Sequence, residues 1–364
     1  ACINGEYYQK KSLEILREVI ENYPIDGVFF NMMGYTGSTY AGENHGICQC
    51  DNCRHRFHER TGLELPKDAN DPNIAVYRQF QRETSYELYT TVTSYIRKLN
   101  KDLVIYNYND VGTSWIASES GGTPLRDGAP YPYNATNNVK PVLGSYNDVV
   151  PVNLTMGFQA IGYRSVLNNA NLLRNWMLEN MLHGAPLGFV VVGTLNHYED
   201  RVFFPDVKEI YSFHQRNEPL FTNVESAAQV ALIQDRYSDD ARGMIRLLTE
   251  EHIPYDIINP AQLTGTRLPR SLDSYKVVIV NNLSDWDENI QQRIQAYVDR
   301  GGKVLAMGTF GMTASGARKQ PDLRLFGVKS INEFYPSKQA TYLKRVPTDS
   351  KLVPDNAPFS LMMM

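Results

Sequence analysis

Apolar and polar residues alternate along the first part of the chain in a pattern that predicts helices and strands in turn. Residues 12–22 place leucine, valine and isoleucine side chains on one face, which indicates an amphipathic helix. Residues 25–31 form a short apolar run that ends in a polar residue, as a buried parallel strand does. A loop rich in proline, asparagine and tyrosine is expected from about 121 to 145. The other predicted elements before residue 218 are helices at 73–99, 169–183 and 206–217 and strands at 103–109, 114–118, 149–155, 160–166 and 188–193.

This alternation predicts a parallel sheet with right-handed crossovers, and polar residues gather where the predicted strands end. In a β/α barrel, that edge of the sheet carries the active site. About five strands are convincing or plausible here, whereas a complete barrel needs eight. We therefore expect an α/β fold in which residues 1–222 form a (β/α)8 TIM-type barrel that is N-terminally incomplete and lacks its first two or three strands.

The pattern changes after Pro219, where shorter β-branched strands alternate with two helices. This second region predicts a small doubly wound α/β unit. We expect a flavodoxin-like domain over residues 223–335, followed by the start of an incomplete C-terminal segment at 336–364. The predicted elements are strands at 229–234, 255–258, 276–281 and 303–307 and helices at 241–251 and 288–300.

Composition and charge narrow the class of protein. The chain is 42% hydrophobic and 21% charged, which is ordinary for a globular protein, and its net charge is −4. Because no block of lysine and arginine occurs, neither nucleic acid nor an anionic membrane surface is expected as a partner. Apolar runs stay below the roughly 20 residues that cross a bilayer. No signal peptide is visible, so we expect a cytoplasmic location. We also expect that the N-terminus is truncated.

The four cysteines are the most specific feature of the sequence, and three of them, Cys48, Cys50 and Cys53, lie within six residues. Those three cannot all pair among themselves, and a disulfide would require Cys2 and strained geometry. Four thiolates complete a closed tetrahedral zinc site, so we predict one structural zinc ion bound by all four cysteines. Unpaired thiols and disulfides remain as alternatives. His45, His55 and His58 are competing ligands, and His45 is the substitute if Cys2 lies too far away.

The pattern Cys48-x-Cys50-x-x-Cys53-Arg54-x-x-Phe57 resembles the zinc loop of family 42 glycoside hydrolases, the β-galactosidases with a trimerisation domain. In that family a fourth cysteine lies some forty-odd residues upstream, the place that Cys2 occupies. Residues 25–57 resemble still more closely a related group of glycoside hydrolases that includes the α-L-fucosidases of family 151. The resemblance implies a carbohydrate substrate, a flavodoxin-like trimerisation-type second domain and a homo-oligomer, either a trimer or a dimer, formed through that domain.

Glycoside hydrolysis uses two carboxyl groups, and in a barrel both are expected at strand ends. The resemblance implies a glutamate after an asparagine at the end of the strand before the zinc loop. Here Asn31 is followed by Met32, so that acid is absent, and Asn31 is expected to hydrogen-bond a sugar hydroxyl or to serve as a turn residue. Glu119 is the best catalytic candidate, because it ends a predicted strand and desolvation beside Trp115 would raise its pKa toward general-acid use. The alternative is an exposed loop glutamate.

The remaining candidates also lie at predicted strand ends or in the loop over them. Glu43 is the candidate for the second catalytic carboxylate, with solvation of an ordinary loop as the alternative. The other predicted substrate-binding residues are His45, Asn107, Asn109, Arg164 and His197. For Arg164, which would clamp a carboxylate or orient Glu119, a structural ion pair is the alternative.

Two functions compete for this sequence. The first is a glycoside hydrolase, an exo-glycosidase of α-L-fucosidase or β-galactosidase type that uses carboxyl acid/base chemistry. The second is a catalytically inactive relative that binds carbohydrate or assembles a complex, which the missing acid at Met32 favours. A zinc-dependent hydrolase is disfavoured, because four thiolate ligands would leave the metal no open position.

Overall fold

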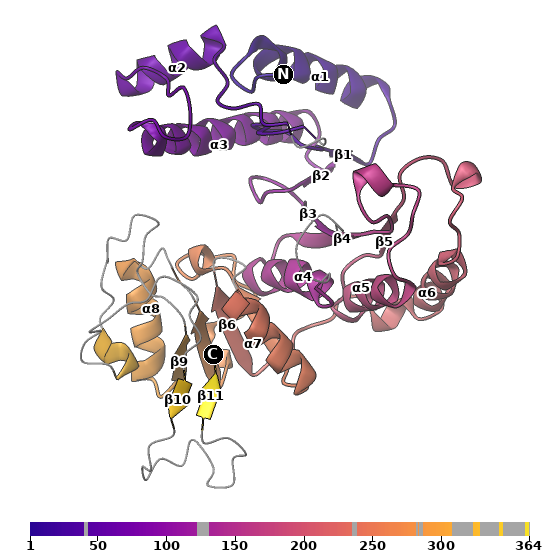
Figure 1. The fold of residues 1–364 in the computed structure, drawn as a ribbon, viewed down its shortest axis with the longest axis vertical. Helices are drawn as coiled ribbons and strands as arrows, with labels where there is room; N and C mark the ends of the chain where they lie inside the picture. The colour runs from indigo at the N-terminus through magenta and orange to yellow at the C-terminus, as the bar shows by residue number, and fades with distance from the viewer. Residues whose placement is uncertain are drawn as a thin grey trace. The chain divides into compact units, whose positions relative to one another are not determined.

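The computed structural model (Figure 1) describes residues 1–39, 43–121, 131–234, 239–281, 283, 287–307, 323–327, 342–344 and 361–363. The chain forms two compact units, Ala1–Pro321 and Asp322–Met364. In the second unit β10 (Tyr342–Lys344) pairs antiparallel with β11 (Leu361–Met363). Most of the expected C-terminal segment at 336–364 lies outside the described residues.

The first sheet consists of parallel strands that stand in the order in which they occur along the chain. Neighbouring strands are therefore joined by crossover connections, as in a β/α barrel, and the sheet fits part of a TIM-type barrel. This agrees with the predicted incomplete barrel. The strands are β1 (Gly27–Phe29), β2 (Val104–Asn107), β3 (Trp115–Ser120), β4 (Val150–Met156) and β5 (Gly188–Val190).

Helices accompany the strands of this sheet (Figure 1). On α3, buried Leu88, Val92 and Ile96 recur at helical spacing and pack against Leu16 of α1 and Ile105 of β2. The helices of this region are the π-helix η1 (Tyr7–Lys11), α1 (Ser12–Asn22), α2 (Asp51–Thr61), α3 (Ile74–Leu99), α4 (Asn134–Ser145), α5 (Ala170–Leu182) and α6 (Phe204–Arg216), with short 3-10 helices η2 (Ile161–Tyr163), η3 (Leu195–His197) and η4 (Glu218–Leu220).

Three sequence predictions were wrong. The loop expected at 121–145 contains α4, whose asparagine, threonine, proline and glycine residues have low helix propensity. Packing compensates, because Ala135, Val139 and Val142 are buried on one face of the helix. The strand expected at 160–166 is replaced by η2. The cysteine-bearing segment was expected to be a loop, but α2 begins at Asp51, carries Cys53 and ends at Thr61. Gly62 follows the helix with a φ of 68°, which suits glycine.

The second sheet also lies within the unit Ala1–Pro321, and its strands are parallel in the order β7-β6-β8-β9. The predicted boundary between residues 222 and 223 therefore stays a prediction. The strands are β6 (Val230–Gln234), β7 (Tyr255–Ile258), β8 (Val277–Asn281) and β9 (Lys303–Met307), the helices are α7 (Asp239–Glu250) and α8 (Glu288–Asp299), and the short 3-10 helices are η5 (Pro260–Gln262), η6 (Leu272–Ser274) and, in the second unit, η7 (Leu323–Phe326).

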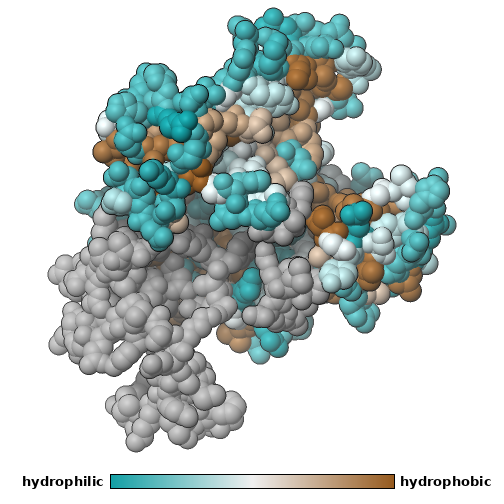
Figure 2. All heavy atoms as spheres, turned by 45° about the horizontal axis from the view of Figure 1, so that its top comes forward, coloured by the Kyte–Doolittle hydropathy of each residue, from teal (hydrophilic) through white to brown (hydrophobic). Residues whose placement is uncertain are grey.

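Hydrophilic side chains cover most of the described surface in Figure 2, where hydrophobic side chains form separate patches. Some large apolar side chains are exposed, among them Phe29, Tyr108 and Trp115 of the first sheet region. Among the described helices, none has both the length and the apolar character that crossing a bilayer requires.

Helix α4 packs directly against the edge strand β7. A Cβ atom added to Gly144 would lie 2.2 Å from the carbonyl oxygen of Ile257, so this position admits only glycine without a shift of the backbone. One residue later, the Ser145 hydroxyl accepts a hydrogen bond of 2.8 Å from the Asn259 amide. The close approach of α4 to β7 thus depends on Gly144, which has no side chain.

We predict that Gly144→Ala lowers the free energy of unfolding by about 2–3 kcal/mol, because the new methyl group collides with backbone atoms. The matched control is Gly243→Ala, also inside a helix, where an added Cβ meets nothing within 4 Å. That control is expected to be neutral or to stabilise by up to about 1 kcal/mol. Urea unfolding of both variants measures the difference, and equal stability would show that α4 and β7 do not pack this closely.

Candidate functional site

A cavity of about 460 Å³ opens at the carboxyl ends of β1, β2 and β3. It brings together four of the predicted site residues, which come from three different strands or the residues that follow them. The described lining consists of Asn31, Met32, Met33, Tyr89, Asn107, Tyr108, Asn109, Ser118 and Glu119. Parallel strands explain this convergence, because their carboxyl ends share one edge of the sheet.

Glu119 is held by a neighbour that the sequence did not reveal. The Tyr108 hydroxyl donates a hydrogen bond of 2.6 Å to Glu119 Oε1. The side chains of Glu119 and Trp115 are both exposed, so the expected burial of Glu119 beside Trp115 is not found. Burial, together with the charge of Glu119, raises the pKa of Tyr106 to about 12. The carboxyl group of Glu119 is thus accessible to solvent, and the hydrogen bond from the Tyr108 hydroxyl sets its orientation.

Two asparagines of β2 and its following loop have different roles. Asn107 is buried, and its Nδ2 atom has no hydrogen-bond partner among the described residues. A buried donor without a partner is costly, so this amide suits a water molecule or a ligand hydroxyl in the cavity. Asn109 instead accepts a hydrogen bond of 3.0 Å from the Val111 amide, which shapes the turn after the strand.

Met32 stands where the family resemblance implies a glutamate, and its backbone is unusual. Its φ angle is 56°, in the left-handed region that residues other than glycine, asparagine and aspartate rarely adopt. The side chain is 50% exposed and lines the cavity beside Asn31. A strained, exposed methionine at a strand end is consistent with a position under functional constraint.

Beneath Glu119, a buried amide fixes the end of β3. Asn153 of β4 is fully buried, and its Oδ1 accepts hydrogen bonds from Ser118 Oγ at 3.2 Å and Asn138 Nδ2 at 2.9 Å. Its Nδ2 donates to Asn180 Oδ1 at 2.9 Å. Asn138 also donates to the Glu119 carbonyl oxygen at 2.9 Å. The network therefore ties the backbone that carries Glu119 to helices α4 and α5.

Four other predicted site residues do not line this cavity. Glu43 is exposed, and its amide donates to Thr39 Oγ1 at 3.1 Å. His45 is exposed and lines a separate cavity of about 550 Å³ together with Cys2 and Cys48. Arg164 and His197 are also exposed, near η2 and in η3, away from the described lining around Glu119.

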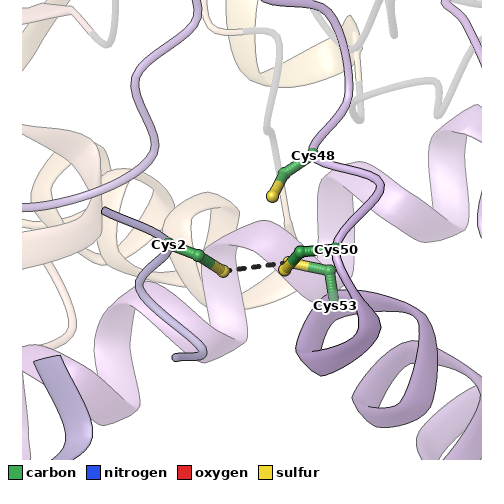
Figure 3. Close-up of side chains that lie close together, drawn as sticks. All are labelled: Cys2, Cys48, Cys50 and Cys53. Carbon is green, nitrogen blue, oxygen red and sulfur yellow. Dashed lines mark hydrogen bonds between the residues drawn. The ribbon is translucent and has the colours of Figure 1, made fainter. Parts of the chain in front are cut away.

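The four cysteines meet in space, as Figure 3 shows for Cys2, Cys48, Cys50 and Cys53. Their sulfur atoms lie within 4.8 Å of one another, and the sulfurs of Cys2 and Cys53 are 3.3 Å apart. All four are free thiols. Tetrahedral zinc with Zn–S bonds of about 2.3 Å separates its sulfur ligands by about 3.8 Å, so this donor set fits the ion. Cys2 is close enough to take part, and the substitution by His45 is not needed.

The surroundings of the cysteines differ. Burial raises the pKa of the Cys53 thiol, which is fully buried and accepts a hydrogen bond of 3.4 Å from Asn4 Nδ2. Burial also acts to raise the pKa of Cys50, but hydrogen bonds from the Cys53 amide and from neighbouring thiols outweigh it and lower that pKa. Cys50 caps the N-terminus of α2, a position that favours a thiolate.

Sequence reasoning missed Tyr108, Tyr89 and Asn153. A signal existed for Tyr108, since it lies between two asparagines that were predicted to be site residues. Tyr89 lies in the middle of α3 and reaches the loop after β1, donating to the Met33 carbonyl oxygen at 2.9 Å. Nothing local marks Asn153, which is an asparagine inside an apolar strand and matters because of the partners that packing brings to it.

No family model and no curated protein matches the sequence. Among similar solved structures are α-L-fucosidase isoenzyme 2 from Paenibacillus thiaminolyticus, with a TM-score of 0.62 and 21% identity, and a cold-adapted β-galactosidase from Rahnella sp. R3, with 0.59 and 16%. Gan42B, a family 42 β-galactosidase from G. stearothermophilus, has a TM-score of 0.67 and 15% identity.

The matches cover most of this chain: 86% for the fucosidase, 84% for the Rahnella enzyme and 94% for Gan42B. The chain spans only 46%, 55% and 62% of those proteins, respectively. At these identities the likeness shows a shared fold. The predicted resemblance to family 42 β-galactosidases and to an α-L-fucosidase is therefore confirmed at the level of the fold.

We predict that Asn153→Leu lowers the free energy of unfolding by about 3 kcal/mol, because the apolar side chain leaves Asn138, Asn180 and Ser118 without their buried partner. The control Asn22→Ala removes an exposed asparagine whose Nδ2 donates to the Glu18 carbonyl oxygen, and a change within about 0.5 kcal/mol is expected. Urea unfolding measures both variants. A loss no larger in Asn153→Leu than in the control would contradict the buried network.

Proposed function

We propose that this chain, which has the fold of the family 42 β-galactosidases, is the catalytic-type part of a glycoside hydrolase and that Glu119 is one of its carboxyl groups. The observation that carries the proposal is the cavity of about 460 Å³ that Glu119, hydrogen-bonded by Tyr108, lines together with the asparagines of neighbouring strand ends. Amide and carboxyl groups beside exposed aromatic rings suit a sugar, which offers hydroxyl groups at its rim and C–H groups on its face.

Glu119 would transfer a proton to or from the glycosidic oxygen or a water molecule, and Asn31 and Asn107 would bind sugar hydroxyls. The Tyr108 hydrogen bond occupies Oε1, which leaves Oε2 to face the substrate. We also propose Glu43 as the second carboxyl group, with Asn109, His45, Arg164 and His197 as further substrate-binding residues. The α-L-fucosidase or β-galactosidase type of activity is proposed from the neighbours' names and the fold.

A second candidate function is carbohydrate binding without turnover. It is favoured by the described lining of the cavity, in which Glu119 is the single carboxylate and Met32 replaces the glutamate that the resemblance implies. Retaining and inverting glycosidases both need two carboxyl groups, about 5 to 9.5 Å apart. Hydrolysis of aryl α-L-fucosides and β-D-galactosides separates the two candidates, since only the first predicts turnover.

For the enzyme, we predict that Glu119→Gln lowers kcat/KM on the aryl glycoside by about a hundredfold or more, because the amide cannot transfer the proton. Tyr108→Phe, which removes the orienting hydroxyl, is expected to cost about tenfold. The matched control is Glu59→Gln, an exposed glutamate on α2 outside the cavity. Wild-type rates in Glu119→Gln would remove Glu119 from the mechanism, and loss of activity in the control would point to misfolding.

We also propose that the four cysteines bind a structural zinc ion. The support is the mutual approach of four sulfur atoms from two separate segments, the N-terminal residues and the segment that runs from Cys48 into the first turn of α2. When bound, zinc would hold the deprotonated thiolates together and fix the segment between β1 and α3, without an open position for substrate. A small core of Phe57, Tyr77 and Phe80 packs beside the cysteines and would share that stabilisation.

We predict about one zinc per purified chain by elemental analysis, and loss of that zinc in Cys53→Ser. The control His45→Ala is expected to retain it, because His45 lies beside the cysteines but outside the ligand set. Since zinc binds thiolates, acidification should release the metal as protons compete for the sulfur atoms. A folded wild-type protein without metal, or zinc loss in the control alone, would contradict this ligand assignment.

The partners of the chain complete the proposal. Residues 223–335 are proposed to form a flavodoxin-like domain that joins the chains into a trimer or dimer, supported by the parallel order β7-β6-β8-β9. The proposed substrate is a carbohydrate. We propose neither nucleic acid nor a membrane as a partner of the chain, and we propose the cytoplasm as its location.

A further inference from the structure

A groove of about 840 Å³ adjoins the cavity around Glu119. One wall is the loop after β1, from Met32 to Ser38, and the other is the face of α3 that carries Tyr86 and Tyr89. The groove shares Met32, Met33, Tyr89 and Asn109 with the smaller cavity. A ligand held at Glu119 would therefore have room to continue along α3.

The charge of this groove differs from that of the whole chain. Its charged lining residues are Arg78 and Arg82, and its described lining contains no aspartate or glutamate, although the net charge of the chain is −4. The acidic residues of this part of α3 face α2 instead. There Glu87 forms ion pairs with Arg56 at 2.5 Å and Arg60 at 2.7 Å. Helix α3 thus separates its charges, with the paired carboxylates on one side and the two arginines on the groove.

Neither groove arginine is neutralised by a carboxylate among the described residues. Arg82 donates to the Gln79 side-chain oxygen through Nε at 3.1 Å and through NH2 at 2.5 Å, which fixes its guanidinium and leaves other N–H groups for a ligand. Arg78 forms no ion pair with a described residue. Guanidinium groups bind planar or tetrahedral oxyanions through paired N–H donors.

Aromatic and neutral polar side chains surround the arginines. Tyr86 is 61% exposed, and Tyr89, Gln81 and Ser85 also line the groove. Flat aromatic faces stack on sugar rings, and amide and hydroxyl groups bind sugar hydroxyls. A groove with this lining suits a saccharide, and the two unneutralised arginines favour one that carries negative charge.

We propose that this groove binds an anionic sugar residue, one that bears a carboxylate or a sulfate group, and that Arg78 and Arg82 bind the anionic group. As a part of the substrate, this residue would be linked to the sugar held at Glu119, and that detail rests on the proposed glycosidase function. The binding itself does not require turnover. The substrate class is therefore an acidic oligosaccharide rather than a neutral galactoside or fucoside alone.

The test measures binding of three probes by isothermal titration calorimetry: trigalacturonate, a sulfated carrageenan tetrasaccharide and neutral galactotriose. At least one anionic probe is expected to bind wild-type protein about tenfold more tightly than the neutral one, and more weakly as salt rises. The two anionic probes distinguish carboxylate from sulfate. The double variant Arg78→Gln/Arg82→Gln should bind anionic and neutral probes alike.

The control variant Lys98→Gln/Lys101→Gln removes two exposed positive charges, one in the last turn of α3 and one just after the helix, and should keep the preference for the anionic probe. Equal binding of all probes by the wild type, absence of binding, or anionic binding that survives the loss of both arginines would overturn the inference. The same titration in Glu119→Gln separates the two proposals, because this variant is expected to lose turnover but to keep arginine-dependent binding of the anionic probe. Arginine-dependent binding in a protein without glycosidase activity would refute the proposed function and uphold this one.

Discussion

Parallel pairing of β1 to β5 in chain order is the constraint on which the candidate site depends. Each strand enters the sheet in the same direction, so the residues that follow β1, β2 and β3 must emerge at one edge. Asn31, Asn107 and Glu119 are distant in sequence and line one cavity for this reason. The backbone hydrogen bonds of the sheet thus place the polar groups before any side-chain contact orients them.

Orientation then comes from buried polar groups rather than from the cavity itself. Asn153 lies on the strand next to Glu119, is fully buried and connects β3 to helices α4 and α5 through side-chain amides. Such a network stabilises one arrangement because each member would be left unpaired in any other. On the open side, the Tyr108 hydroxyl orients the carboxylate. Asn138 therefore holds the Glu119 backbone through its carbonyl oxygen, and Tyr108 holds the Glu119 side chain through Oε1.

Helix α3 links three regions through different faces. Leu88, Val92 and Ile96 pack in the core with α1 and β2, and Glu87 pairs with arginines of α2 beside the cysteine cluster. The remaining face carries Arg78 and Arg82 along the groove. The proposed zinc ion would fix α2, and through the ion pairs between α2 and α3 it would also steady the groove wall. The cavity around Glu119, the proposed zinc site and the groove would then all depend on the position of α3.

The sequence by itself determined most of the strands, the long helices and the four cysteines of the predicted metal site, because these depend on local periodicity and on residue chemistry that does not change on folding. It also placed Asn31, Asn107, Asn109 and Glu119 at strand ends, and these four residues line one cavity. It failed at α4, whose residues are poor helix formers and whose helix is stabilised by burial of Ala135, Val139 and Val142 and by contact with β7. Only the tertiary structure brought the Tyr108 hydroxyl to Glu119 and buried Asn153. It also separated the acidic residues of α3 from its two groove arginines. Finally, it placed Glu43, Arg164 and His197 outside the lining of the cavity. These outcomes depend on which distant segments meet, and no local pattern specifies that.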